Sequence, residues 1–218
     1  NTADNTSLVN TNSSIYDGTA ASPNGEQIAI LEQYYPRIYN VADLTLHNRP
    51  QTGYYPYGIA ASPDGSRWYV TRYNSLHIVR SYDYAVTDSI PVGNYARGVA
   101  VSPDNRYVYV TNYSSNTVSA IRVADKSVTT IPVGSSPLGI AVSPRGDYVY
   151  VANTGSNGVS IIGADPGSGD FNTVISTVAV NGPYGVSFTP DGSKAYVPSS
   201  TDHTVAVIDT ATRTTTRT

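Results

Sequence analysis

Tyrosine and arginine are the side chains of this sequence best suited to binding chemistry. The chain has 19 tyrosines, and 11 of its 13 basic residues are arginines. Tyrosine rings offer flat, rigid stacking area, and arginine adds charge-assisted hydrogen-bond donors. The alternative is that these tyrosines pack inside the fold with only their hydroxyl groups in water. The candidate ligand-binding residues, all in or beside predicted loops, are Tyr54, Tyr57, Arg72, Tyr73, Tyr95, Arg97, Tyr113 and Tyr184.

The residue types that enzymes use for covalent or metal chemistry form no recognisable set. There is no cysteine, and His47, His77 and His203 are not spaced as metal ligands. The Gly-x-Ser-x-Gly elbow of many hydrolases is absent. The glycine-rich segment 163–170 has neither the lysine nor the following helix of a phosphate loop. We therefore predict no catalytic residue, no metal and no cofactor.

Acidic residues recur at fixed places, but turn chemistry accounts for them. Asp64, Asp104 and Asp191 each follow a Ser-Pro or Thr-Pro pair and precede glycine or asparagine. Proline presets φ for the first central residue of a tight turn, aspartate bonds the local backbone, and glycine or asparagine accepts a positive φ. The pattern predicts turns rather than a metal site.

Composition excludes several classes of protein. Only 13% of residues are charged, the net charge is −3, and no basic stripe is present, so we expect no nucleic-acid partner. No apolar stretch is long enough to predict a transmembrane helix. A polar, lysine-poor surface rich in Thr, Asn and Tyr favours an extracellular, cell-surface or periplasmic location.

The strongest signal in the sequence is an internal repeat. The motif Gly-x-Ala-x-Ser-Pro, with one drifted copy, begins at five glycines separated by 40, 40, 41 and 46 residues. These leading glycines are Gly18, Gly58, Gly98, Gly139 and Gly185. A period of about 40 residues is typical of β-propeller blades.

Each repeat reads as four short strands. The glycine motif is followed by a turn, a strand of period two such as Tyr107–Val110, a second apolar strand and a Thr-rich strand. Helical periodicity is absent, so the sequence predicts an all-β propeller of four-stranded antiparallel blades, with five repeats in residues 15–218. Residues 1–14 are expected to be a polar leader or the last strand of a preceding blade. The blades are expected at about 17–50, 57–93, 97–134, 138–181 and 184–218.

The repeat resembles a known family. The string Tyr109-Val110-Thr111-Asn112, the similar string at 150–153 and the flanking residues 131–134 resemble the YVTN β-propeller repeat over about residues 7–218. The resemblance implies a seven-bladed propeller of surface-layer or periplasmic type, similar to lactonase-type and amine-dehydrogenase-type propellers. It implies no catalytic residues, because the family has no shared catalytic motif.

Five repeats leave two arrangements open. Seven blades of this length need about 280 residues, more than this chain has. The chain is therefore either a segment of a longer propeller or a closed five-bladed ring. A segment would expose apolar blade faces that carry Ile28, Ile30, Val205 and Val207, and it would then self-associate or lie beside flanking chain.

These observations predict an exported, non-catalytic surface, adhesion or assembly module. Its partner, a protein or a carbohydrate, would bind the Tyr/Arg-rich loops. The alternative is a lactonase-type or amine-dehydrogenase-type enzyme whose site is dispersed over several blades and leaves no local motif. Candidate glycosylation sites of the Asn-x-Ser type, which support export, are Asn5, Asn12 and Asn112.

Overall fold

A computed structural model of the protein describes residues 15–32 and 34–217. They contain twenty β-strands and one short 3-10 helix, η1 (Thr154–Ser156). No helix within these ranges has the length and apolar character needed to cross a bilayer. The leader or preceding strand predicted for residues 1–14 lies outside the described residues.

The strands form five antiparallel sheets, each with four consecutive strands in chain order, and each sheet is one blade. Blade one contains β1 (Ile15–Ala21), β2 (Gln27–Glu32), β3 (Pro36–Asn40) and β4 (Leu46–Asn48). Blade two contains β5 (Pro56–Ala61), β6 (Arg67–Arg72), β7 (Ser75–Arg80) and β8 (Val86–Pro91). Blade three contains β9 (Ala96–Val101), β10 (Tyr107–Asn112), β11 (Thr117–Arg122) and β12 (Val128–Pro132). Blade four contains β13 (Pro137–Val142), β14 (Tyr148–Asn153), β15 (Gly158–Gly163) and β16 (Val174–Ala179). Blade five contains β17 (Ser187–Phe188), β18 (Lys194–Ser199), β19 (Thr204–Asp209) and β20 (Thr214–Arg217).

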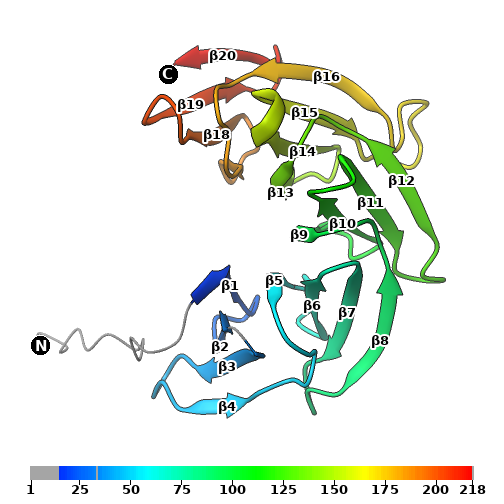
Figure 1. Ribbon diagram of the computed structural model, residues 1–218, viewed down its shortest axis with the longest axis vertical. Coiled ribbons are helices and arrows are strands. Elements are labelled where there is room, and N and C mark those ends of the chain that lie inside the picture. Colours follow the sequence, from blue (N-terminus) through cyan, green and yellow to red (C-terminus); the bar gives the residue numbers. More distant parts are fainter. Residues whose placement is uncertain (1–14, 33, 218) are drawn as a thin grey trace, which may run out of the picture.

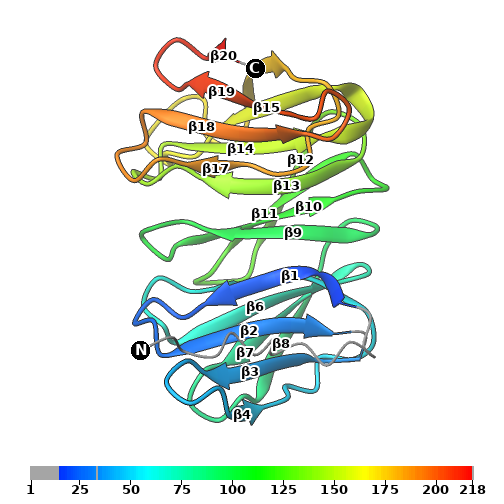
Figure 2. The ribbon, with the colours of Figure 1, turned by 90° about the vertical axis from the view of Figure 1, so that its left-hand side faces the viewer.

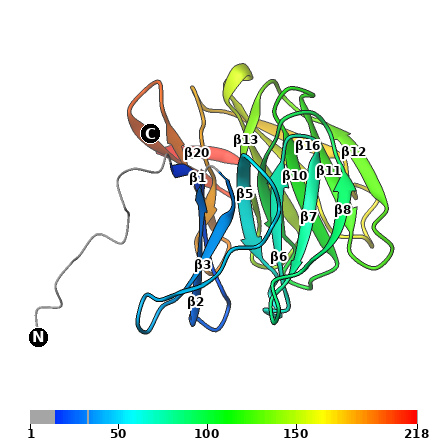
Figure 3. The same ribbon diagram turned by 60° about the horizontal axis from the view of Figure 1, so that its bottom comes forward.

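The blades are arranged radially around a common centre. The first strands, β1, β5, β9 and β13, lie innermost, and the fourth strands lie on the outer rim (Figure 1). Figure 2 shows the blades following one another from blade one to blade five, and Figure 3 shows the strands of blade two side by side. Because each blade is a meander, its first-to-second and third-to-fourth turns lie at one end. Its other connections lie at the opposite end, here called the loop end. The predicted all-β propeller architecture is confirmed.

Neighbouring blades are held together by apolar side chains that alternate along the second strand. In blade three, Val108 and Val110 pack against blade two, whereas Tyr109 packs against blade four. The same division occurs in blade four, where Val149 and Val151 face blade three and Tyr150 faces blade five. The period of two along a strand therefore builds one buried cluster on each side of the sheet.

Backbones approach closely where two inner strands meet. A Cβ atom on Gly98 would lie 2.5 Å from the carbonyl oxygen of Leu138 in the next blade. The Thr111 hydroxyl donates a 2.8 Å hydrogen bond to that same oxygen. One blade earlier, a Cβ on Gly58 would lie 2.2 Å from the Arg97 carbonyl oxygen, which accepts a 2.6 Å bond from the Thr71 hydroxyl. Only glycine fits at the head of these inner strands.

The five described blades form an open arc rather than a closed ring (Figure 1). Four buried clusters join blades one to two, two to three, three to four and four to five. Tyr196 of blade five occupies the position of Tyr109 and Tyr150, yet it is 38% exposed whereas they are fully buried. Val205, beside Tyr196 on the same face, is 49% exposed. At the other end of the arc, Ile28 is half-buried.

The close approach predicts a sharp difference between equivalent glycines. Gly98→Ala and Gly139→Ala place a Cβ 2.5 Å from backbone atoms of the next blade, so each should lower the free energy of unfolding by about 1–3 kcal/mol. Gly185→Ala is the matched control, because its nearest atom, on Pro198, is 3.9 Å away. Chemical denaturation of the three variants measures the difference. Equal midpoints for all three would contradict the packing argument.

Candidate functional site

The innermost strands of blades two, three and four each have an irregularity in strand pairing just before the leading glycine. Along β5, Pro56 and Gly58 pair with adjacent residues of β6, so Tyr57 is an extra residue, a β-bulge. Register shifts occur at the same place in β9 and β13, around Arg97 and Leu138. A bulge bends its strand and re-aims a side chain. The residue before the leading glycine is thereby turned toward the centre of the arc.

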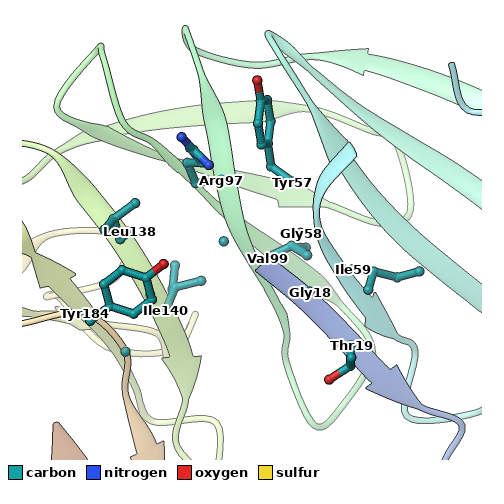
Figure 4. Close-up of a pocket in the computed structure, with 13 residues that line it drawn as sticks. Gly18, Thr19, Tyr57, Gly58, Ile59, Arg97, Val99, Leu138, Ile140 and Tyr184 are labelled. Carbon is teal, nitrogen blue, oxygen red and sulfur yellow. The ribbon is translucent and has the colours of Figure 1, made fainter. Parts of the chain in front are cut away.

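A cavity of about 370 Å³ lies at that centre, lined by the inner strands. Figure 4 shows Arg97 beside Tyr57 on one wall and Tyr184 near Leu138 and Ile140 on another. One wall is therefore cationic and aromatic, and the other is apolar and aromatic. The described lining residues include no Asp, Glu or His, so they offer no ordinary general base at neutral pH.

Arg97 is the centre of an aromatic cluster at the loop end. Its guanidinium carbon lies 4.3 Å from the ring centroid of Tyr57, 4.6 Å from that of Tyr95 and 5.8 Å from that of Tyr113. Cation–π contacts at these distances stabilise a charged arginine. Among the described residues no carboxylate pairs with Arg97, and its buried Nε has no hydrogen-bond partner.

The tyrosines of this cluster differ in exposure. Tyr57 is 8% exposed and Tyr73 is 49% exposed, and their ring centroids are 6.3 Å apart. Burial raises the pKa of the Tyr57 hydroxyl above its ordinary value of 10, and a hydrogen bond with Tyr95 adds to the effect. The hydroxyl therefore stays protonated at neutral pH. Tyr57 is suited to holding Arg97 in place, and about half of Tyr73 remains exposed beside the Tyr57 and Tyr95 rings.

Several loop tyrosines adopt backbone conformations that usually favour glycine. φ is +60° at both Tyr55 and Tyr95, which precede the inner strands of blades two and three. The equivalent residues of blades four and five are Ser136 and Gly182, also with positive φ. A residue other than glycine in this region costs on the order of 1–3 kcal/mol. At these positions the backbone conformation strains a tyrosine and would not strain a glycine.

A second group of tyrosines lies beside the first, on blades one and two. The ring of Tyr54 is 5.3 Å from that of Tyr34 and 6.2 Å from that of Tyr35. Arg72 Nε donates a 2.7 Å hydrogen bond to the Tyr54 carbonyl oxygen, which fixes the loop. This group and the Arg97 cluster are here together called the tyrosine band, which consists of Tyr34, Tyr35, Tyr54, Tyr55, Tyr57, Arg72, Tyr73, Tyr95, Arg97 and Tyr113.

Comparison with protein families decides the assignment of the chain. The family described as "Lactonase, 7-bladed beta-propeller" matches residues 68–188, more than half of the 218 residues. The chain belongs to this family. A comparison with curated proteins found no match. The described arc has five of the seven blades in the family's description.

Solved structures agree with the fold of this lactonase-family propeller. A functionally unknown protein from Desulfotomaculum acetoxidans DSM 771 is similar, with a TM-score of 0.80 at 19% identity, over 93% of this chain and 69% of that one. Kuenenia stuttgartiensis hydrazine synthase is similar with a TM-score of 0.57 at 19% identity, over 89% of this chain and 83% of that one. At such identities the likeness concerns the fold.

The structure brings most of the sequence-predicted site residues together. Tyr57, Tyr73, Tyr95, Arg97 and Tyr113 form the Arg97 cluster, and Tyr54 and Arg72 belong to the neighbouring group. Tyr184 lies apart from them, on the opposite wall of the cavity (Figure 4). Sequence reasoning missed Leu138 and Thr19 as lining residues. The signal for Leu138 was its place before a leading glycine, the position held by Tyr57, Arg97 and Tyr184.

The glycosylation prediction for Asn112 is wrong for the folded propeller. Asn112 is fully buried, and its Nδ2 donates hydrogen bonds to Ser119 (2.9 Å) and Thr117 (3.0 Å). A glycan on that nitrogen would displace both bonds and has no room. Asn5 and Asn12 lie outside the described residues.

The turn aspartates are occupied by local hydrogen bonds. Asp191 accepts bonds from the Thr189 hydroxyl (2.5 Å) and from the backbone NH (3.0 Å) and hydroxyl (2.9 Å) of Ser193. The Thr189 bond first, then those from Ser193, lower the pKa of Asp191 from 3.8 to about 2. No group of three His, Cys, Asp or Glu residues arranged to hold a metal ion occurs in the described part of the chain.

His77 has a local structural role. It lies in β7, where its Nε2 is 3.1 Å from the Ser75 hydroxyl. Burial lowers the pKa of His77, and the nearby Arg72 charge lowers it further, so it is neutral at pH 7. His47, in β4 of blade one, packs edge-on against the Tyr84 ring of blade two at 5.2 Å, and His203 lies in the turn before β19 with φ of +54°.

The exposure difference within the Arg97 cluster predicts different effects on stability. Tyr57→Ala removes a buried ring that holds Arg97, and it should lower the free energy of unfolding by about 3 kcal/mol. Tyr73→Ala removes a half-exposed ring and should change it by less than about 1 kcal/mol. Thermal melts of both variants measure this. Equal destabilisation would mean that Tyr73 is a packing residue.

The turn geometry predicts a pH dependence for Asp191. A depressed carboxyl pKa stabilises the fold above the unfolded-state value, and this contribution is lost as pH falls through the folded-state value. Asp191→Asn should therefore lower the melting temperature at pH 7, and the difference from wild type should disappear between pH 4 and about pH 2. An NMR titration of the Asp191 carboxyl carbon with a midpoint near 3.8 would contradict the assignment.

Proposed function

We propose that this chain is the binding portion of an exported, non-catalytic β-propeller that attaches to an extracellular carbohydrate or protein through its tyrosine band. The observation that carries the proposal is Arg97. It is held over three aromatic rings at the cavity, and no described carboxylate pairs with it. A guanidinium kept charged and without an anionic partner is a ready hydrogen-bond donor for a ligand.

Features of the repeat support a YVTN-type propeller, and with it a surface-layer or periplasmic location. Each residue of the string 109–112 makes a specific contact, three of them between blades and that of Asn112 within blade three. Tyr109 and Val110 fill opposite seams, Thr111 bonds the next inner strand, and Asn112 bonds Ser119. The low charge and the absence of cysteine and lysine-rich segments are compatible with export.

The family match favours one other candidate, a lactone-hydrolysing enzyme. Opening a lactone by hydrolysis requires a group that activates water, usually a carboxylate, a histidine or a metal ion. The described lining of the cavity supplies only hydroxyl, guanidinium, apolar and backbone groups. The most buried of the hydroxyls, on Tyr57, has a raised pKa and stays protonated. Binding is therefore the better-supported function.

Two measurements on the full chain separate binding from hydrolysis. Opening of δ-gluconolactone, followed by pH-stat, should proceed at the uncatalysed rate. Affinity electrophoresis through gels that contain pectin, alginate, dextran or soluble chitosan should show retardation in at least one gel, and Arg97→Gln should remove it. Catalysed lactone opening that is lost in Arg97→Gln would instead establish the enzyme.

A further inference from the structure

Ion pairing differs between the two ends of the propeller. The turn end carries the carboxylates Asp64, Asp104 and Asp191 in first-to-second turns and Asp83, Asp125 and Asp209 in or beside third-to-fourth turns, and three of them, Asp83, Asp104 and Asp125, pair there with Arg80, Arg106 and Arg122. At the loop end, Arg37 is paired with Glu32 at 2.7 Å, whereas Arg72 and Arg97 have no carboxylate partner among the described residues. The tyrosine band is therefore locally cationic on a chain whose net charge is −3.

The neighbouring rings of Tyr73, Tyr95 and Tyr113 are evenly spaced near the Arg97 guanidinium, and Tyr73 is the most exposed of the three. The Tyr73 and Tyr95 ring centroids are 6.1 Å apart, and so are those of Tyr95 and Tyr113. Tyr73 and Tyr54 are 49% and 51% exposed. The Tyr73 and Tyr95 rings are nearly perpendicular, at 83°, and the Tyr95 and Tyr113 rings are tilted by 54°, so the band presents closely spaced rings at different angles with Arg97 among them.

Resting on the proposed function, we propose that the tyrosine band binds an acidic polysaccharide, one whose sugar units carry carboxylates. The guanidinium of Arg97 donates to a sugar carboxylate, and Tyr73 and Tyr113 pack against the C–H faces of neighbouring sugar rings. Planar guanidinium groups match carboxylates with paired hydrogen bonds. The hydroxyl edges of the tyrosines remain in water, where they bond the hydroxyl groups of the sugar.

The chemistry of the band favours a polysaccharide over an acidic protein segment. Protein partners usually anchor a side chain in a fully desolvated pocket at the centre of an interface. Here the rings around Arg97 range from the buried Tyr57 to the 49% exposed Tyr73, so the band offers partly exposed rings rather than one fully desolvated pocket. Flat, wet faces with an isolated cationic group suit a ligand made of repeating polar rings.

The test compares carboxylated and esterified forms of the same oligosaccharide. Calorimetry should show that the full chain binds oligogalacturonate, oligomeric alginate or oligomeric hyaluronan at least 10-fold more tightly than the methyl-esterified form of the same oligomer. Raising the salt concentration should weaken the binding of the carboxylated form. This comparison needs no variant, so it holds even if a substitution unfolds the chain.

Variants then place the site. Arg97→Gln should weaken binding at least 10-fold and Arg97→Lys by less, and Tyr73→Ala should weaken it several-fold with an unchanged melting temperature. Arg145→Gln is the matched control, because Arg145 is an exposed arginine at the turn end, and it should bind like wild type.

The outcomes distinguish this inference from the proposed function. If esterified and carboxylated oligomers bind equally and Arg97→Gln still weakens binding, the band binds sugars without selecting acids, and only the present inference fails. If Arg145→Gln weakens binding as much as Arg97→Gln, the attraction is nonspecific charge, and the inference also fails. If neither these oligomers nor the four gel polysaccharides bind, the inference fails. The proposed function then keeps only a protein as its partner. Binding of an acidic peptide in place of all sugars would overturn the inference and leave the proposed function standing.

Discussion

The close approach of each inner strand to the next is the constraint on which the rest of the structure depends. Gly58 brings its backbone against the carbonyl oxygen of Arg97, and the Thr71 hydroxyl bonds that oxygen. Gly98 and Thr111 make the equivalent contacts with the carbonyl oxygen of Leu138 in the next blade. Because the fixed carbonyl belongs to a residue at the cavity, the seam between two blades also positions a functional side chain of the second. Packing and site geometry are therefore set by one contact, repeated along the arc. A side chain larger than hydrogen at the glycine would shift both at once.

The sequence predicted the blade because every copy of the repeat satisfies the same local rules. A leading glycine, a Pro-containing turn and strands of period two each have a physical requirement that can be read from residue types. The environment of a copy cannot be read in the same way. Tyr109 and Tyr196 occupy the same place in the repeat, yet the first is fully buried and the second is 38% exposed. The difference arises from whether a described blade lies beside them. Sequence therefore left the ring and the arc as alternatives, and only the set of inter-blade clusters separated them.

The candidate site was predicted in composition but not in arrangement. Loop positions rich in tyrosine and arginine identified the band, because the second-to-third connections and those between blades lie together at the loop end. The spacing of residues in the sequence could not predict the β-bulge that turns Tyr57 and Arg97 toward the cavity, because a bulge depends on the pairing of two strands. Nor did it separate Tyr57, which is buried, from Tyr73, which is half-exposed. The error at Asn112 has the same origin. Its acceptor pattern is a property of three residues, whereas its burial is a property of the sheet.

The conflict between backbone and side chain at Tyr55 and Tyr95 is the most informative departure from the repeat. Both have φ of +60°, and blade five has Gly182 at the equivalent place. Local preference and global fold usually agree in a natural sequence, and exceptions concentrate at functional sites. Blade four has Ser136, also with positive φ, at the same place, so the turn geometry is shared and the blades differ in the side chain that it carries. For Tyr95 the contribution within the fold is its contact with Arg97, 4.6 Å away. That contact places the Arg97 guanidinium over the Tyr95 ring, and no described carboxylate pairs with it. In the proposed function, the same contact presents the arginine to a ligand.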